Sequence, residues 1–255
     1  MKRIICAVLA ISMIFALAAC SGKGSEETTT FPTPVIEEKS HSKAFTDESG
    51  KTVFTVDVII PQVTEKCDEK TKAFINRKAF ELFENACNFA QNNLENAGEF
   101  MRQNNSDAPW SKKITFETTL HNNRFLCFMV KDSLSYFGGE GGSVFSTLCF
   151  DIQKGRICTL ADFATSPDDA EGCFDMFLND VVAPVLHDRF HNPDYITEDV
   201  LERLDEIADM ECFYLTEKGL GIYFDKSDVH EFLSGTYKIS FSWDEIGALM
   251  QHNLE

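Results

Sequence analysis

The stretch LSYFGGEGGSVFSTLCFDIQKGRICTLADF, residues 134–163, decides the fold. It predicts a strand that ends in a glycine cluster, a second strand, a turn and a third strand. Leu148, Phe150 and Ile152 share one face of the second strand, with the two-residue period of a half-buried strand. Lys154-Gly155 supplies a turn in which glycine can take a positive φ. This segment is therefore expected to form the core of a mixed sheet.

Segments upstream of this stretch carry a strand pattern, a helix pattern and a hairpin pattern. Residues 51–63 alternate apolar with polar side chains and predict a strand. Residues 68–98 place apolar side chains at steps of three and four, which predicts a long amphipathic helix whose stripe packs on a sheet. Residues 112–120 and 125–130 alternate again on either side of an asparagine pair, which predicts a hairpin.

Segments downstream continue in blocks of helices and then strands. Ser166 and the proline after it predict a helix start, and Pro184 is expected to kink or end that helix. Residues 197–208 suit a third helix, residues 213–224 a hairpin, and residues 237–250 a last strand with a closing helix. Such blocks predict an α+β fold, with a largely antiparallel mixed sheet and helices packed on one side.

The amino terminus has the pattern of a bacterial lipoprotein leader. Lys2 and Arg3 precede an apolar run over residues 4–19, which is too short for a stable membrane span. The run ends in Leu17-Ala18-Ala19-Cys20, which resembles a lipobox. We expect cleavage before Cys20 and acylation of this cysteine, so that the chain is held on the extracytoplasmic side of the cell membrane by lipid alone. The alternative is an ordinary signal peptide with an incidental cysteine.

Composition divides the rest of the chain. Residues 1–19 form the expected signal peptide, and residues 20–42, rich in Ser, Thr, Glu, Lys and Pro, predict a flexible tether. Residues 43–255 are expected to form the folded domain, with subregions over about 43–135 and 136–250.

The charge of the chain limits its partners. Loss of Lys2 and Arg3 with the leader takes the formal charge from −18 to −20. Such a chain repels nucleic acid and anionic headgroups, and its field favours cations and basic proteins. Acidity also serves simply to keep a domain soluble, which accounts for most of these charges.

Seven cysteines remain after Cys6 and Cys20 are set aside. An odd number cannot pair completely within one chain, and no CxxC motif indicates zinc or redox chemistry. Most of the seven lie beside apolar residues, as small buried hydrophobes do. We therefore expect reduced, buried cysteines, and the best candidate for a bridge is Cys149 with Cys158.

His187 and His191 are the residues that most resemble a catalytic motif. Histidines four apart suit one helical face, as in zinc hydrolases. Pro184 before the pair, a proline at 193 and the lack of a spaced third ligand weigh against a metal site. We expect no cofactor, no metal and no catalytic residues, and we keep a metal-dependent hydrolase and a purely structural envelope lipoprotein as alternatives.

The order of elements and several short motifs resemble the extracellular domain of RsiV-type anti-sigma factors. The match covers roughly residues 43–250. It depends on Tyr136-Phe137-Gly138-Gly139, Phe150-Asp151-Ile152, Lys154-Gly155, Thr159-Leu160-Ala161-Asp162-Phe163, Phe213-Tyr214-Leu215-Thr216, Gly219-Leu220, Tyr223-Phe224 and Ser234-Gly235.

This resemblance implies recognition of a protein or cell-wall ligand, because the domain binds lysozyme in the anti-sigma factors. The sigma-binding segment and membrane helix of that family are replaced here by the lipobox. Glu140 and Gly141 stand where the family often has a small residue and a histidine. Tyr136 and Phe137 as apolar anchors and Glu140 as a charged one are the candidate ligand contacts, and burial in the sheet is the alternative for the two aromatic side chains.

Overall fold

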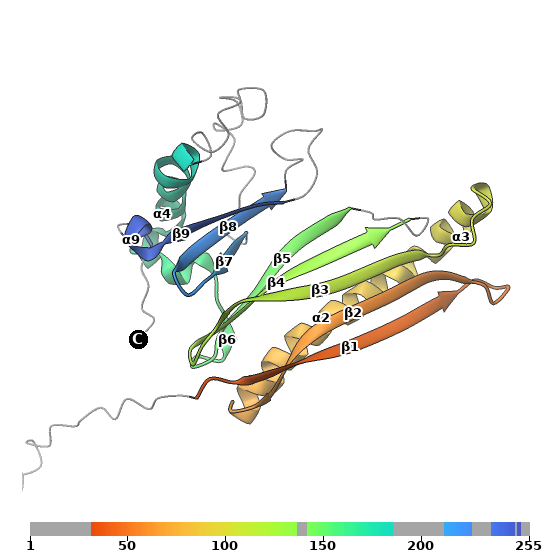
Figure 1. Cartoon of the computed structure of the whole chain (residues 1–255), viewed down its shortest axis with the longest axis horizontal. Helices are drawn as coiled ribbons and strands as arrows, with labels where there is room; N and C mark the ends of the chain where they lie inside the picture. The colour runs from red at the N-terminus through yellow and green to blue at the C-terminus, as the bar shows by residue number, and fades with distance from the viewer. Residues whose placement is uncertain (1–31, 137–141, 186–211, 226–235, 248, 251–255) are drawn as a thin grey trace, which may run out of the picture. The chain divides into compact units, whose positions relative to one another are not determined.

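The computed structural model describes residues 32–136, 142–185, 212–225, 236–247 and 249–250 (Figure 1). Within these residues, one sheet has six strands in the order β1-β2-β3-β4-β5-β6, and a second has three in the order β7-β8-β9. The strands of the larger sheet are β1 (Val35–Thr46), β2 (Thr52–Glu65), β3 (Trp110–His121), β4 (Phe125–Ser135), β5 (Ser143–Asp151) and β6 (Arg156–Ile157). Neighbours in it run antiparallel, except for the parallel pair of β2 and β3. The predicted α+β class with a largely antiparallel mixed sheet is confirmed.

The alternation of apolar and polar side chains in β2 explains why this strand lies near the centre of the buried cluster between the larger sheet and its helices. Phe54, Val56, Val58 and Ile60 are at most 3% exposed and face the helices, as their alternation predicts. The strand continues through Pro61, because β2 pairs with β3 only as far as Val58 and no ladder bond to β3 is lost beyond it.

Strand β1 begins at Val35 rather than after residue 42, so residues 35–42 belong to the sheet and not to the tether. Their polar side chains gave no strand signal. Pairing with the apolar strand β2 orders them, which is a tertiary effect that composition does not show.

Two helices connect the parallel strands β2 and β3, as such a crossover requires. They are α2 (Glu69–Asn92) and α3 (Leu94–Gln103), which cover one face of the six-stranded sheet (Figure 1). The side chain of Asp68 caps α2 by accepting a hydrogen bond from the Thr71 amide at 3.0 Å. The predicted single helix is broken at Asn93, whose side chain donates to the Phe89 carbonyl at 2.8 Å.

Two cysteines cross-link β4 and β5. Cys127 lies directly opposite Cys149, with Cα atoms 4.2 Å apart, and the two form a disulfide. Cys158 is a buried free thiol, and its amide donates to the Cys149 carbonyl at 2.7 Å. The expectation of reduced cysteines is wrong for this pair, and so is the candidate bridge from Cys149 to Cys158, because Cys149 is bonded to the strand on its other side.

The second sheet consists of β7 (Phe213–Leu215), β8 (Gly219–Asp225) and β9 (Thr236–Ser242). The predicted hairpin and last strand are confirmed, whereas the closing helix α9 covers only Trp243–Ile246. One buried cluster joins side chains of β4, β5, α4 and this sheet. The sequence boundary at residue 136 therefore divides two paired strands, β4 and β5, of one sheet.

Short helices follow β6 within the described residues. They are η1 (Leu160–Phe163), η2 (Pro167–Asp169), α4 (Ala170–Phe177) and a π-helical turn over Leu178–Val182. The π turn lies just before Pro184, and the helical backbone continues to residue 185. Proline removes a helical hydrogen bond, and the widened turn accommodates it without ending the helix. No helix in the described ranges has the length and apolar character needed to cross a bilayer.

Candidate functional site

Tyr136 is the one predicted ligand contact that the structure describes. It follows the end of β4, and its side chain is 41% exposed. Its ring lies edge to face against Trp110, with centroids 4.7 Å apart, and 6.1 Å from Phe100. The ring is thus partly packed against other rings and partly exposed to solvent, and its role as a ligand contact stays a prediction.

The other residues that the sequence singled out lie outside the described residues. They are Phe137 and Glu140 of the predicted contact loop, the expected lipidation site Cys20, and the histidine pair His187 and His191.

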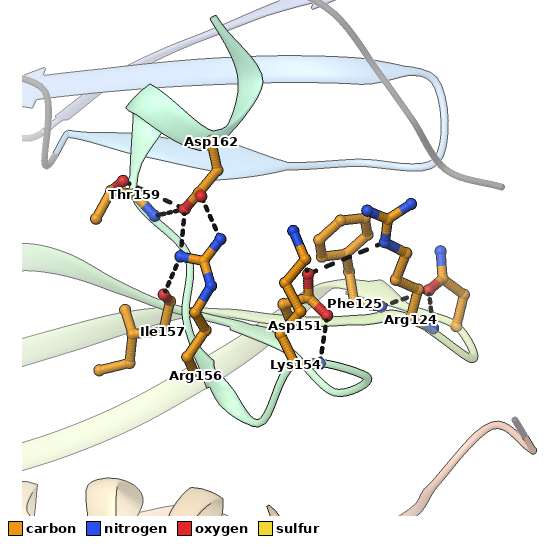
Figure 2. A network of polar contacts seen from close by, with 9 residues as sticks. Arg124, Phe125, Asp151, Lys154, Arg156, Ile157, Thr159 and Asp162 are labelled. Atoms are coloured by element: carbon orange, nitrogen blue, oxygen red, sulfur yellow. Dashed lines mark hydrogen bonds and ion pairs between the residues drawn. The ribbon is translucent and has the colours of Figure 1, made fainter. Parts of the chain in front are cut away.

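A polar pocket of about 210 Å³ lies beside the turn between β5 and β6, under η1. Its lining gathers three cationic side chains and two carboxylates (Figure 2). These are Arg124, Lys154, Arg156, Asp151 and Asp162.

Asp151 is the buried charge of this pocket, with 2% of its surface exposed at the end of β5. Its Oδ1 accepts a hydrogen bond from the Lys154 amide at 3.0 Å, in the turn that Gly155 closes with φ +62°. Its Oδ2 lies 3.7 Å from Lys154 Nζ and 4.0 Å from Arg124 Nε. A carboxylate so deeply buried needs nearby cations, and the turn provides one of them.

Arg156 and Asp162 form the opposite wall. The guanidinium binds both carboxylate oxygens, one of them at 2.9 Å from Nη1, and Nη1 also donates to the Ile157 carbonyl (Figure 2). Asp162 Oδ2 further accepts from the Thr159 amide at 2.8 Å, which closes a capping box on η1. Partial burial alone would raise the pKa of Asp162, but the hydrogen bonds from Arg156 and Thr159 outweigh it and hold that pKa below its usual value.

Cys158 completes the lining as a thiol. Burial, reinforced by the charges of Asp151 and Asp162, raises the pKa of Cys158 to about 12. This thiol is therefore protonated at neutral pH and is no nucleophile there. Lys154, with a side chain 55% exposed, is the most exposed of the five charged side chains in the lining.

A second feature is the acidic surface, which we define as Asp168, Asp169, Glu171, Asp175 and Asp180. All five side chains are exposed, and residues 157–185 include no lysine, arginine or histidine. Among the described residues none of the five makes an ion pair. Met176, 45% exposed, lies among them.

No protein-family model and no curated protein matches this chain. Several chains of solved structures do match it, and two of them are DUF3298 family proteins. The one from Bacteroides fragilis is 15% identical, with a TM-score of 0.56 over 87% of this chain and 96% of that chain. The one from Pseudomonas aeruginosa is 9% identical, with a TM-score of 0.56 over 88% of this chain and 98% of that chain.

The chain has the fold of DUF3298 proteins. That family is related to the RsiV-type extracytoplasmic domains, so the comparison agrees in fold with the resemblance found in the sequence. At these identities the likeness concerns fold alone, and the function of the DUF3298 neighbours is itself unknown.

Sequence reasoning missed the pocket, although the motifs that carry the resemblance supply three of its five charged side chains. Asp151, Lys154 and Asp162 all fall within those motifs. The available signal was Asp151, a charged residue between Phe150 and Ile152 in an apolar strand, since a buried charge requires a partner.

Proposed function

We propose that this chain is a lipid-anchored extracytoplasmic binding domain that recognises a basic protein such as lysozyme. Three features support the proposal: the lipobox at Cys20, the formal charge of −18, and a fold related to the RsiV-type domains. The acidic surface is the observation that carries it.

The acidic surface suits a cationic partner in charge. Glu171 and Asp175 lie four residues apart on one face of α4, where like charges repel each other. A cationic ligand relieves this repulsion on binding. Met176 supplies an exposed apolar contact between the charges, the combination found at interfaces with an apolar anchor and a polar rim.

Charge reversal tests this assignment. We expect Asp175→Lys with Asp180→Lys to weaken binding of chicken-type lysozyme to the soluble domain at least tenfold at low salt. Glu48→Lys with Glu65→Lys is the matched control, because it makes the same charge change at exposed positions far along the chain. The association rate of the unaltered domain should fall steeply as salt rises, since exposed charges are screened beyond about 8 Å at physiological ionic strength.

Three outcomes separate the possibilities. Equal weakening by both pairs of substitutions would mean that net charge alone attracts the ligand, against a role for the acidic surface. Weakening only by Tyr136→Ala and Glu140→Lys would instead favour the predicted contact loop. No binding of any lysozyme type at micromolar concentration and low salt would refute lysozyme as the ligand.

A second candidate is recognition of a cell-wall component, which the charged pocket favours. Lys154 Nζ and the buried Asp151 would meet a small ligand that carries carboxylate and amide groups. Titration with soluble peptidoglycan fragments tests this, with Lys154→Ala expected to abolish binding and Lys66→Ala, at an exposed position, expected to leave it unchanged.

A further inference from the structure

The two edges of the six-stranded sheet are unlike. At one edge β6 has only two residues, which leaves little backbone to pair. At the other edge β1 has 12 residues, and no described strand pairs with its outer side (Figure 1). A long edge strand presents a row of backbone donors and acceptors to any strand that fits it.

Strand β1 lacks most of the devices that protect such an edge. Its pairing with β2 is regular from Ile36 to Phe45, with register shifts only at the two ends, and the strand has no proline. Its protection consists of charges, chiefly the exposed side chains of Glu37, Lys39 and Lys43. These charges disfavour a partner strand that places like charges opposite them. They allow a partner strand whose charged residues lie opposite charges of the other sign.

We propose that β1 is the interface of a homodimer, in which the β1 strands of two copies pair antiparallel about a two-fold axis at Ser40. In this register the numbers of any two residues that face each other across the axis add up to 80. Glu37 of one copy faces Lys43 of the other, Val35 faces Phe45, and both pairs occur twice. Such an interface is self-complementary, as a two-fold axis requires.

The faces of the sheet and the charges select this register. The faces of β1 are clear around its middle, where His41 packs against two rings of α2 and Ser42 bonds Asp57 on the other face. Side chains on the same face of the sheet lie opposite each other only in registers where the two facing residue numbers add up to an even number. Two neighbouring registers also meet this condition. In the register with a sum of 82, Lys39 faces Lys43, and in the register with a sum of 78, Lys39 faces Lys39 of the other copy. Both registers therefore bring like charges into contact.

His41 supplies an independent indication. Its Nε2 is buried and has no hydrogen-bond partner among the described residues, beside a slot of about 260 Å³ that Lys39 and Phe80 help to line. In the proposed register Lys39 of the second copy lies directly opposite His41 on the same face, where its ammonium group can donate to this nitrogen. The dimer thus provides a donor to a nitrogen that has none among the described residues of one copy.

Cysteine cross-linking of the full chain in membranes tests the register. In Ser40→Cys the two new side chains lie about 5 Å apart across the axis, so mild oxidation should give a covalent dimer on non-reducing gels. Ser42→Cys is the matched control, because its two copies lie about 14 Å apart in this register. The unaltered chain, with its own free cysteines, sets the background. A Ser40→Cys band no stronger than this background, or an equal band from Ser42→Cys, would overturn the proposal.

Charge exchange tests the pairs without a cross-link. Glu37→Lys or Lys43→Glu alone replaces two attractive pairs by two repulsive ones and should weaken the dimer about tenfold in sedimentation of the detergent-solubilised chain. The double variant Glu37→Lys with Lys43→Glu should restore it. A monomeric unaltered chain at every concentration, or a double variant weaker than either single one, would count against this interface, which does not depend on the proposed ligand.

Discussion

The disulfide between Cys127 and Cys149 leads to the most quantitative prediction. It closes a loop of 22 residues, and both cysteines are buried, at 0% and 2% exposure. The loop-closure relation gives about 3.4 kcal/mol of stabilisation for roughly 22 residues at 25 °C. Cys127→Ala with Cys149→Ala should lose at least this much, because the cavity left by two sulfur atoms acts in the same direction.

Urea unfolding of the soluble domain measures the loss. With a slope of about 2–3 kcal/mol per molar urea, the midpoint should fall by roughly 1–2 M. Cys87→Ala with Cys212→Ala is the control, since these free cysteines are only partly buried, and it should shift the midpoint much less. A shift of the first variant no larger than that of the control would refute the reasoning, and so would peptide mapping that joins Cys149 to Cys158.

Four further predictions concern other parts of the chain. Cys20→Ala should release the protein or leave its leader uncleaved, and a processed, detergent-extracted form of that variant would contradict the lipid anchor. Protein purified without a histidine tag should contain substoichiometric zinc, and one tightly held zinc lost in the variant His187→Ala with His191→Ala would favour the hydrolase. Because the pKa of Cys158 is about 12 and its ordinary value is 9.0, the folded chain holds a proton that the unfolded chain has lost between these values. Stability should therefore fall as pH rises from 9 to 12, by up to about 1.4 kcal/mol per unit, and Cys158→Ala should reduce this slope. Gly221→Ala should destabilise the second sheet by about 1–3 kcal/mol in thermal unfolding, because its Cβ would lie 2.1 Å from a tyrosine ring of β7; an unchanged midpoint would contradict this packing.

Local patterns predicted most of the fold. Alternation in β2, helical spacing in α2 and turn residues around Asn122 and Gly155 each act over a few neighbours, and each is confirmed. Features that depend on distant partners were missed. Strand β1 has polar side chains and is ordered by β2. The closing helix α9 ends at Ile246, and Leu249 and Met250 beyond it pair with residues 164 and 165.

The pocket and the disulfide show the same limit for sites. Cys149 has a cysteine opposite it on β4 and another on its other side, so sequence spacing alone could not decide between Cys127 and Cys158. Asp151 indicated a buried charge, but Arg124 lies 27 residues before it and is brought near only by the pairing of β4 with β5. Of the predicted contacts, Tyr136 is partly exposed, as a ligand anchor would have to be.

The parallel pair of β2 and β3 has a consequence for the order in which the chain folds. In the described residues, every other neighbouring pair in the larger sheet is also adjacent in sequence, whereas residues 66–109 separate these two strands. Closing that long connection costs roughly 2 kcal/mol more than closing a short hairpin turn. We therefore expect β3, β4 and β5 to assemble first, with β1, β2 and α2 docking afterwards as one unit. In native-state hydrogen exchange the β1–β2 hairpin should then open together with α2, at a lower free energy than the disulfide-linked strands β4 and β5.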